Sequence, residues 1–386
     1  MPVRIVDVCA FYSPSGGGVR TYVDAKLRSA SRLGHEIVVL VPSENAEVTE
    51  VAPGALIAGI PAPTMTFDRR YRYFNDTNRL HRELDIWRPD HVECSSPWSS
   101  ASAVARWRGG ATRSLFMHSD PMAAYAYRWF GFLNPAVVDG LFSRFWDHMR
   151  FLGGSFDTVV SPSRQLAERL RQRGLTNVAT IPLGVDRSFS PARRDPSLRE
   201  SMLAELGLGP SATLLLSVGR LAPEKRPELI ARAAAQAGRS REAGLVLVGE
   251  GPMRRKLERL AAASGRVRLL GHISDRELVA RLMASADALV HGCEAETFGL
   301  VLAEALACGT PVIVPDRGGA FEQLRPGLGL AYAAGDKAEL TRALIRFIAL
   351  QGSAPTRAPI AAPRLMEDHF RELFGLYGQF ALKAAA

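Results

Sequence analysis

Two glutamates with seven residues between them, Glu296 and Glu304, flank the start of an expected helix within Cys293–Pro315. The first lies in a loop after a hydrophobic strand, and the second lies inside the helix, which we expect to end at a left-handed cap on Gly309. A carboxylate placed as Glu304 is suited to accept two hydroxyl donors of a ribose. The structural alternative is that Glu296 only complements the helix dipole and that Glu304 lies on a solvated face.

Backbone amides at two helix starts are suited to binding a phosphate group. One set belongs to Phe298, Gly299 and Leu300, where Gly299 lets a ligand approach the backbone closely. The other follows the glycine run Gly16–Gly18, between an expected strand and an expected helix. This run is not a dinucleotide fingerprint, because Thr21 stands where the third small residue belongs.

Arg220 and Lys225 bracket a loop that follows the strand ending at Gly219. Two cations near a helix start, at the carboxyl edge of a sheet, form a phosphate clamp. The chain has 43 Arg and only 5 Lys, so a lysine in this loop indicates that a point charge is required there. The alternative is that both residues are ordinary surface charges.

His118 follows an expected strand, where a histidine can donate to a substrate hydroxyl or stabilise developing charge. A lone histidine is equally compatible with a structural role. His118 and Asp120 have no third residue spaced to complete a metal site, and the chain contains no Asp-x-Asp sequence. The sequence therefore gives no support for a bound metal ion.

Apolar side chains of the stretch 125–156 recur at helical spacing. Packing against a core explains such a face, and contact with a membrane interface is the alternative. The residues on this face are Val138, Leu141, Phe142, Phe145, Trp146, Met149 and Leu152.

Length and composition predict two globular domains: the chain has 386 residues, of which 47% are hydrophobic and 23% charged. The net charge of +9 is spread evenly, with 21 Lys and Arg against 17 Asp and Glu up to Val185 and 27 against 22 after it, which argues against a nucleic-acid surface.

The longest uncharged run, Val51–Phe67, contains three prolines and cannot span a membrane. Four cysteines without a CxxC spacing predict reduced thiols. We expect no signal peptide and a cytoplasmic protein, either free or at the inner face of the cytoplasmic membrane.

Short hydrophobic runs alternate with longer amphipathic stretches along the whole chain, which is typical of βαβ units in a parallel sheet. The fold class is therefore α/β, with two doubly wound domains that face a central cleft. We place the domains at 1–186 and 187–362, and a closing helix in 363–386. The expected strands are Arg4–Phe11, Glu36–Val41, Ala55–Ile60, His91–Cys94, Ser114–His118, Thr158–Ser161, Val178–Ile181, Leu214–Val218, Leu245–Val248, Val267–Leu270, Ala288–His291, Val312–Val314 and Leu328–Tyr332.

Seven motifs along nearly the whole chain resemble those of the retaining nucleotide-sugar glycosyltransferases of family 4, which have the GT-B fold of two Rossmann-like domains. In order they are GGGVRTYV, VVSPSRQLAERL, PLGVDRSFSP, SVGRLAPEKRPELI, LVLVGEGPMRRKLERLA, LLGHIS and EAETFGLVLAEALACGTPVI. The last contains the Glu–seven–Glu pattern of that family. One departure is Leu183, where the family often has asparagine before Gly-Val-Asp, and it puts a linker hydrogen bond in doubt.

The resemblance implies a metal-independent hexosyltransferase with an N-terminal acceptor-binding domain and a C-terminal domain that binds the nucleotide sugar. Arg220 and Lys225 are expected to hold the donor diphosphate, Glu304 to bind the ribose and His118 to lie near the sugar ring. The implied catalytic set is His118, Arg220, Lys225 and Glu296. The implied donor-binding set is Gly16, Gly17, Gly18, Gly219, Arg220, Lys225, Glu250, Ile273, Glu296, Phe298, Gly299, Leu300 and Glu304.

The substrates stay open at this point. The donor is a UDP- or GDP-sugar, and no cofactor, metal or nucleic acid is expected. The apolar stretch 125–156, the RRYRYF sequence at Arg69–Phe74 and the basic isoelectric point of 9.7 favour a lipid or lipid-linked acceptor and contact with an anionic membrane. A polysaccharide precursor is the other acceptor class. The alternative functions are a nicotinamide-dependent oxidoreductase, a non-catalytic nucleotide-sugar-binding module and a sugar-nucleotide epimerase.

Overall fold

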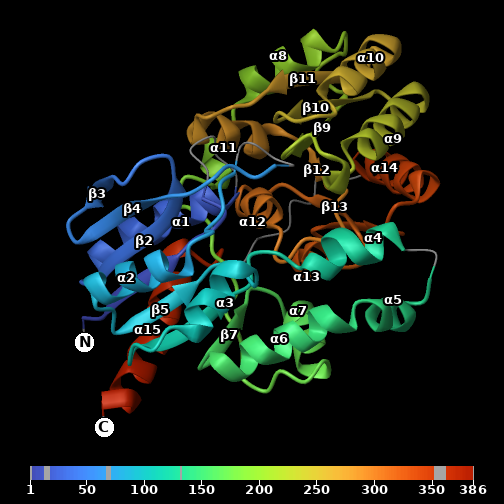
Figure 1. Cartoon of the computed structure of the whole chain (residues 1–386). Coiled ribbons are helices and arrows are strands. Elements are labelled where there is room, and N and C mark those ends of the chain that lie inside the picture. The colour runs from blue at the N-terminus through green and yellow to red at the C-terminus, as the bar shows by residue number, and fades with distance from the viewer. Residues whose placement is uncertain (1, 13–17, 67–70, 131–132, 352–361, 386) are drawn as a thin grey trace. The chain divides into compact units, whose positions relative to one another are not determined.

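The computed structural model describes residues 2–12, 18–66, 71–130, 133–351 and 362–385 (Figure 1). The chain forms two compact units. The first consists of Met1–Pro182 and Met366–Ala386, and the second of Leu183–Leu365. The chain thus passes between the units twice, at 182/183 and 365/366, whereas the sequence places the boundaries after 186 and 362.

The first unit contains a sheet with the strand order β3-β4-β2-β1-β5-β6-β7-β8. Neighbouring strands are parallel, except that β3 pairs antiparallel with β4. The sequence does not predict β3, because its residues are mostly exposed and lack the buried run that marks the other strands. The strands are β1 (Arg4–Val8), β2 (Glu36–Ser43), β3 (Val48–Ala52), β4 (Ala55–Pro61), β5 (His91–Cys94), β6 (Thr112–Phe116), β7 (Thr158–Ser161) and β8 (Val178–Thr180).

Helices cover both faces of the first sheet. Val6 and Val8 of β1 belong to a core with α2, α3 and α6, whereas Asp7 between them contacts α1 on the other face. Figure 1 shows the C-terminal helix α15, in red, on the first unit, and it packs against α1 and β6. The helices are α1 (Gly18–Arg32), α2 (Thr77–Trp87), α3 (Ser99–Arg106), the π-helical turn η1 (Met122–Ala126), α4 (Tyr127–Trp129), α5 (Pro135–Leu141), α6 (Ser143–Ser155), α7 (Arg164–Gln172) and α15 (Met366–Ala385).

A buried ionic network ties α15 to the first sheet. The Lys26 side chain of α1 is fully buried and donates to Asp7 at 2.9 Å and to Glu93 of β5. The Tyr377 hydroxyl of α15 donates to Glu93 at 2.7 Å. Burial lowers the pKa of Lys26, but Asp7 and Glu93 outweigh this effect and raise it, so the lysine stays charged. Because a buried charge is tolerated only when it is paired, these residues fix the position of the last helix.

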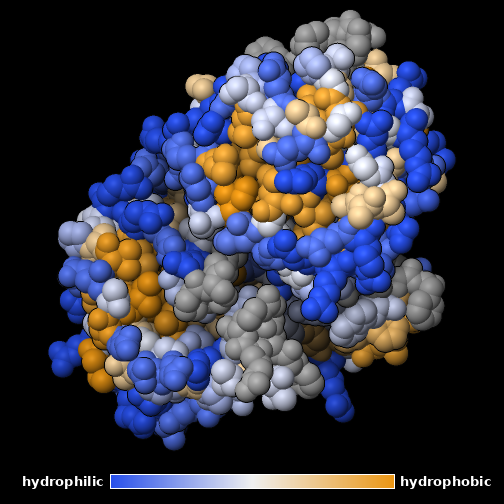
Figure 2. Space-filling view, turned by 90° about the horizontal axis from the view of Figure 1, so that it is seen from above, coloured by the Kyte–Doolittle hydropathy of each residue, from blue (hydrophilic) through white to orange (hydrophobic). Residues whose placement is uncertain are grey.

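The apolar face of the stretch 125–156 is mainly part of the core. Val138, Trp146, Met149 and Leu152 are buried, which confirms the core-packing interpretation for these residues. The face is not continuous, since α5 ends before Phe142 and α6 begins after it, and Leu141 is 63% exposed. Figure 2 shows that hydrophobic patches alternate with hydrophilic residues on the visible surface. Among the described residues, no helix has both the length and the apolarity needed to cross a membrane.

The second unit contains a parallel sheet with the order β11-β10-β9-β12-β13-β14. Helices α8, α11 and α12 cover one face, and α9, α10 and α14 cover the other. The strands are β9 (Thr213–Val218), β10 (Ala243–Val248), β11 (Val267–Gly271), β12 (Ala288–Val290), β13 (Val312–Pro315) and β14 (Gly329–Tyr332). The helices are η2 (Pro191–Arg193), α8 (Pro196–Glu205), η3 (Pro223–Lys225), α9 (Pro227–Ser240), α10 (Arg254–Ser264), α11 (Arg276–Ser285), α12 (Leu300–Ala307), α13 (Gly319–Gln323) and α14 (Lys337–Gln351).

The strand order reverses direction once in each sheet, between β1 and β5 in the first unit and between β9 and β12 in the second. In open parallel sheets, the loops at the carboxyl ends of two such strands diverge and leave a crevice for a ligand. In the second unit these loops are 219–226, after β9, and 291–299, after β12. They contain six of the candidate residues that the sequence singles out: Gly219, Arg220, Lys225, Glu296, Phe298 and Gly299.

Candidate active site

The loops after β9 and β12 bring Lys225 and Glu296 into contact. The two strands are hydrogen-bonded neighbours, with Leu215 opposite Ala288, so their carboxyl ends lie side by side. The Lys225 ammonium at the end of η3 donates to Oε1 of Glu296. The residues are 71 positions apart in sequence, and the strand order is what joins them.

Electrostatics keep this pair charged. Burial raises the pKa of Glu296, but Lys225 and His291 outweigh it and hold the value well below the usual range. Burial lowers the pKa of Lys225, but Glu296 and Cys293 raise it above its usual value. The Glu296 contact fixes the ammonium in place, and the Lys225 side chain as a whole remains 33% exposed.

A second ion pair braces the same two loops. Arg226, the residue after Lys225, donates through Nε to Glu294 at 2.7 Å and also through Nη2. Its backbone is left-handed, with φ of 50°, and it precedes α9. The loop 294–299 also passes very close to the backbone of Gly318. A Cβ added at Gly318 would lie only 2.2 Å from the Glu294 carbonyl oxygen. The geometry of the loop therefore depends on a close backbone approach.

The N-terminus of α12 follows directly after this loop. Gly299 is the N-cap, with φ of 80°, and Leu300 is the first helical residue. Phe298 is buried, and its carbonyl oxygen accepts a hydrogen bond from Gln323 of α13 at 3.0 Å. The amides of this segment are thus held at the start of a helix, in the arrangement that suits a phosphate group.

Glu304 lies in the second turn of α12 and is only 4% exposed, so it does not belong to a solvated face. Its Oε1 accepts a hydrogen bond from Arg276, the first residue of α11. Burial raises the pKa of Glu304, Arg276 lowers it, Asp186 raises it, and the sum of these effects is a raised value.

The other donor-binding candidates of the second unit lie at neighbouring strand ends. Arg220 follows Gly219 at the end of β9, is 44% exposed and pairs with Glu224, not with the carboxylate that binds Lys225. Glu250 follows β10 and pairs with Arg254, and Ile273 follows β11 and packs against the core. These residues line the same edge of the sheet as the Lys225–Glu296 pair.

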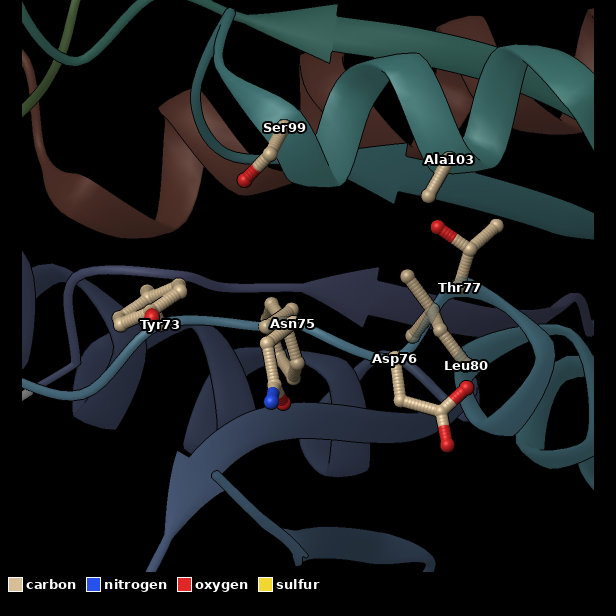
Figure 3. Close-up of a pocket in the computed structure, with 8 residues that line it drawn as sticks. Tyr73, Asn75, Asp76, Thr77, Leu80, Ser99 and Ala103 are labelled. Carbon is tan, nitrogen blue, oxygen red and sulfur yellow. The ribbon is translucent and has the colours of Figure 1, made fainter. Parts of the chain in front are cut away.

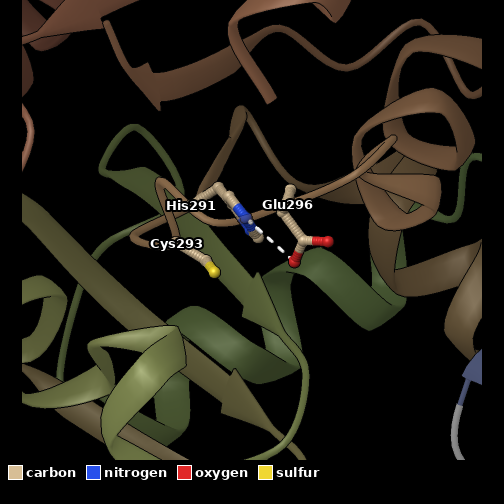
Figure 4. A group of neighbouring side chains, drawn as sticks. All are labelled: His291, Cys293 and Glu296. Atoms are coloured by element: carbon tan, nitrogen blue, oxygen red, sulfur yellow. Dashed lines mark ion pairs between the residues drawn. The ribbon is translucent and has the colours of Figure 1, made fainter. Parts of the chain in front are cut away.

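His291, Cys293 and Glu296 form a group whose possible metal-ligand atoms lie within 4.8 Å of one another. Figure 4 shows the His291 ring beside the Glu296 carboxylate, with Nε2 at 3.4 Å from Oε1. Burial raises the pKa of the Cys293 thiol to about 12, so it stays protonated at neutral pH. With a protonated thiol and the Lys225 ammonium on its carboxylate, this group is poorly suited to a cation.

His118 lies in the first unit, two residues after β6. Its ring packs against Tyr22, at 4.8 Å between centroids, and against Phe116, at 4.6 Å. Burial, and to a lesser degree Lys26, lowers the pKa of His118 to about 3, so the imidazole is neutral at physiological pH. The Tyr22 hydroxyl in turn bonds to His369 of α15 at 3.0 Å. Asp120 pairs with Arg169 at 2.5 Å.

Gly16 and Gly17 lie outside the described residues. Gly18 is the first residue of α1. The glycine run therefore stays a prediction.

A pocket of about 390 Å³ lies between the starts of α2 and α3 in the first unit. Both helices follow parallel strands, so the pocket lies at the carboxyl edge of the first sheet. Figure 3 shows side chains from both helix starts facing one another across it. It is lined by Tyr73, Phe74, Asn75, Asp76, Thr77, Leu80, Ser99 and Ala103.

Four contacts of these candidates do not emerge from the sequence: the Arg226–Glu294 pair, the His291 contact with Glu296, the Arg276 contact with Glu304 and the Tyr22 contact with His118. A cation directly after Lys225 is visible in the sequence. Its left-handed backbone and its partner are not, because both depend on the loop after β12.

Two α/β units with mainly parallel sheets, which solved structures match over nearly the whole chain, define the GT-B fold. Residues 16–189 match the model of the family described as Glycosyltransferase Family 4, and residues 199–362 match that of Glycosyl transferases group 1. The chain belongs to the family-4 glycosyltransferases and is a hexosyltransferase. This finding excludes the oxidoreductase and non-catalytic alternatives.

Two curated relatives come from Mycobacterium tuberculosis. The chain is 34% identical over 316 residues to a GDP-mannose-dependent alpha-(1-6)-phosphatidylinositol dimannoside mannosyltransferase, covering 81% of this chain and 79% of the relative. It is 30% identical over 330 residues to a GDP-mannose-dependent alpha-mannosyltransferase, covering 84% and 82%.

Solved structures support the fold. Sucrose-phosphate synthase from Thermosynechococcus elongatus has a TM-score of 0.77 at 22% identity and covers 99% of this chain and 100% of its own. Anabaena HepE in complex with UDP and glucose has a TM-score of 0.72 at 17% identity and covers 98% and 100%.

Proposed function

We propose that this enzyme transfers mannose from GDP-mannose to a hydroxyl group of a phosphatidylinositol-type glycolipid, with retention of the anomeric configuration and without a metal ion. The observation that carries the proposal is the 34% identity, over most of both chains, to a mannosyltransferase whose name states that donor and that acceptor class. The second mannosyltransferase relative, at 30% identity, shares the donor.

The second unit binds the donor in this proposal. Lys225, Arg220 and the amides at the start of α12 hold the diphosphate and stabilise its charge as the bond to the sugar breaks. Glu304 accepts hydrogen bonds from the ribose. The fixed ammonium of Lys225 supplies the positive charge that a metal ion supplies in other sugar-nucleotide enzymes, which is why we expect no metal requirement.

His118 acts on the sugar in this proposal. A neutral imidazole keeps one N–H donor, which suits a hydroxyl of the transferred sugar better than a second cation does. The ring contacts with Tyr22 and Phe116 restrict its orientation, so the donor group is preorganised.

The first unit binds the acceptor in this proposal. Its pocket at the starts of α2 and α3 combines aromatic, amide and hydroxyl groups, which suits the polyhydroxylated headgroup of a glycolipid. Exposed apolar side chains of η1 to α6 reach the lipid: Tyr125, Trp129, Val137, Leu141 and Phe151 are between 46% and 63% exposed. The enzyme then works at the cytoplasmic face of the membrane.

Donor choice is tested with a thermal-shift screen of GDP-mannose, UDP-glucose, UDP-galactose and ADP-glucose. A donor present at 100 times its Kd stabilises the folded enzyme by about 2.7 kcal/mol through mass action, so GDP-mannose should raise the melting temperature measurably. Stabilisation by UDP-sugars alone contradicts the proposed donor. Transfer of radiolabelled mannose to phosphatidylinositol mannosides, with and without EDTA, then tests acceptor and metal independence.

Membrane contact is tested by flotation with liposomes that contain 30% anionic lipid at low salt. The double substitution Trp129→Ser and Leu141→Ser should reduce the bound fraction. Ile86→Ser, which removes a 67% exposed side chain from α2, is the matched control and should not. Equal flotation of all three proteins contradicts this membrane surface.

A further inference from the structure

Arg276 occupies a helix position that disfavours a cation. It is the first residue of α11, directly after the N-cap Asp275, whose side chain accepts the Glu277 amide at 2.9 Å. The N-terminus of a helix carries partial positive charge, so a cation there destabilises the helix whereas an acidic side chain stabilises it. The presence of arginine at this position therefore calls for an explanation outside the helix.

Two contacts fix the guanidinium of Arg276 in place. Nη2 donates to Oε1 of Glu304, and the guanidinium carbon lies 4.7 Å from the centre of the Phe189 ring. Phe189 is only 2% exposed and belongs to the core of the second unit, so it is a rigid support. A planar guanidinium held by a carboxylate and an aromatic face has little freedom to turn.

The charges around Glu304 oppose one another. Burial raises its pKa and so does Asp186, from the segment before α8, whereas Arg276 of α11 lowers it. Of the other described elements that pack most extensively against α12, α13 carries Glu322 and β13 has no titratable side chain. Arg276 is thus the cation that opposes protonation of this carboxylate.

We propose that Arg276 is a positioning residue that holds Glu304 as an ionised, correctly oriented acceptor for the ribose hydroxyls of the donor nucleotide. The inference rests on the proposed role of Glu304 in donor binding. A carboxylate has about four acceptor sites, so one bond from Arg276 leaves capacity for two hydroxyl groups. A protonated Glu304 loses part of that capacity and with it the ability to bind a ribose tightly.

Helix α11 is fixed in position by contacts other than those of Arg276, so substitution of Arg276 should leave the fold intact. Arg281 of α11 pairs with Asp195, and Glu277 pairs with Arg193 at 2.8 Å. The Asp195 amide donates to Ser285 at 2.9 Å. Arg281→Gln is therefore a matched control that removes a cation from the same helix without touching Glu304.

The experiment measures the Kd of GDP and of 2′,3′-dideoxy-GDP by calorimetry from pH 5.5 to 8.5. Both ligands carry the same diphosphate, so the ratio of the two Kd values reports the ribose hydroxyls alone. In the wild type and in Arg281→Gln, GDP should bind about 10- to 100-fold more tightly at neutral pH, as expected for hydrogen bonds to a charged group. As the pH falls, Arg276→Gln should lose this preference for GDP at a higher pH than the wild type does. Arg276→Lys, which keeps the charge, should move the midpoint of this loss back toward the wild-type pH.

Two results separate the inference from the proposed function. If Arg276→Gln keeps the wild-type preference and the wild-type midpoint, Arg276 does not position Glu304 and the inference is wrong. If Glu304→Gln itself leaves the preference unchanged, Glu304 does not bind the ribose, and the proposed donor site is wrong.

Discussion

Replacement of Lys225 by glutamine is the sharpest test of the donor site. The substitution removes the ammonium that contacts Glu296 but keeps a side chain of similar reach. Loss of one preorganised donor to a developing charge lowers kcat by about 10²–10³, which corresponds to about 2.7–4 kcal/mol in the activation barrier. We therefore expect turnover near the detection limit of a GDP-release assay, with GDP-mannose as donor and a phosphatidylinositol mannoside as acceptor.

The same substitution has a smaller effect on stability. It leaves the Glu296 carboxylate, which is 15% exposed, without its ammonium partner, at a cost of about 1–3 kcal/mol. For a domain of this size each kcal/mol lowers the melting temperature by about 2–4 °C, so the variant should still be folded at 25 °C. Lys256→Gln, which removes a 54% exposed lysine paired with Glu228, is the control and should change neither quantity.

The pH dependence sharpens this test. The pKa of Glu296 is lowered in the folded enzyme. Its contribution to folding stability is therefore fully present above the pKa of a glutamate in the unfolded chain and is lost only in strong acid. The pKa of Lys225 is raised, so its contribution is present below the unfolded lysine pKa and is lost only in strong alkali. The defect of Lys225→Gln should therefore be constant from pH 6 to 9. Wild-type turnover in a folded variant, or a defect that vanishes within this range, refutes the reasoning.

Three further substitutions test other parts of the structure. Lys26→Met leaves two buried carboxylates unpaired and should destabilise the first unit by about 3–5 kcal/mol in chemical denaturation, whereas Lys256→Met should not. Burial lowers the pKa of His91 to about 3. Between that pH and about 6.5 the unfolded chain binds a proton that the folded chain does not, so the free energy of unfolding falls by about 1.4 kcal/mol for each unit of decreasing pH. His91→Gln should remove this part of the pH dependence of the unfolding free energy. Gly318→Ala forces a Cβ against the Glu294 carbonyl oxygen and should lower donor affinity in calorimetry, and an unchanged Kd would show that the loop tolerates the shift.

The sequence predicts the parallel strands well, because buried strands in such sheets are continuous hydrophobic runs. Ala243–Val248 of β10 is buried at every position, and its interior stands out in the sequence. Strand β3 is missed for the opposite reason, since VTEVA is an exposed edge segment. The expected strand Arg4–Phe11 is too long, as β1 ends at Val8.

The candidate site is predictable in its members but not in its pairings. Glu304 stands out in the sequence as a lone acid among alanines and leucines, and its burial agrees with that signal. Its partner Arg276 is 28 residues away on another helix, and only the packing of α11 against α12 joins them. The Tyr22–His369 bond joins residues 347 positions apart, a distance over which local patterns carry no information.

The docking of α15 has a consequence for biosynthesis. Residues 183–365, which form the second unit, are synthesised as one uninterrupted stretch. All strands of this unit are therefore available once that stretch has left the ribosomal exit tunnel. The first unit, although its residues 1–182 are made earlier, lacks the buried side chains of Phe370, Phe374 and Tyr377 until residues 366–386 have been added. Chains truncated after residue 365 and released from the ribosome should therefore contain a folded second unit beside an incomplete first one, the reverse of the order in which the two were synthesised.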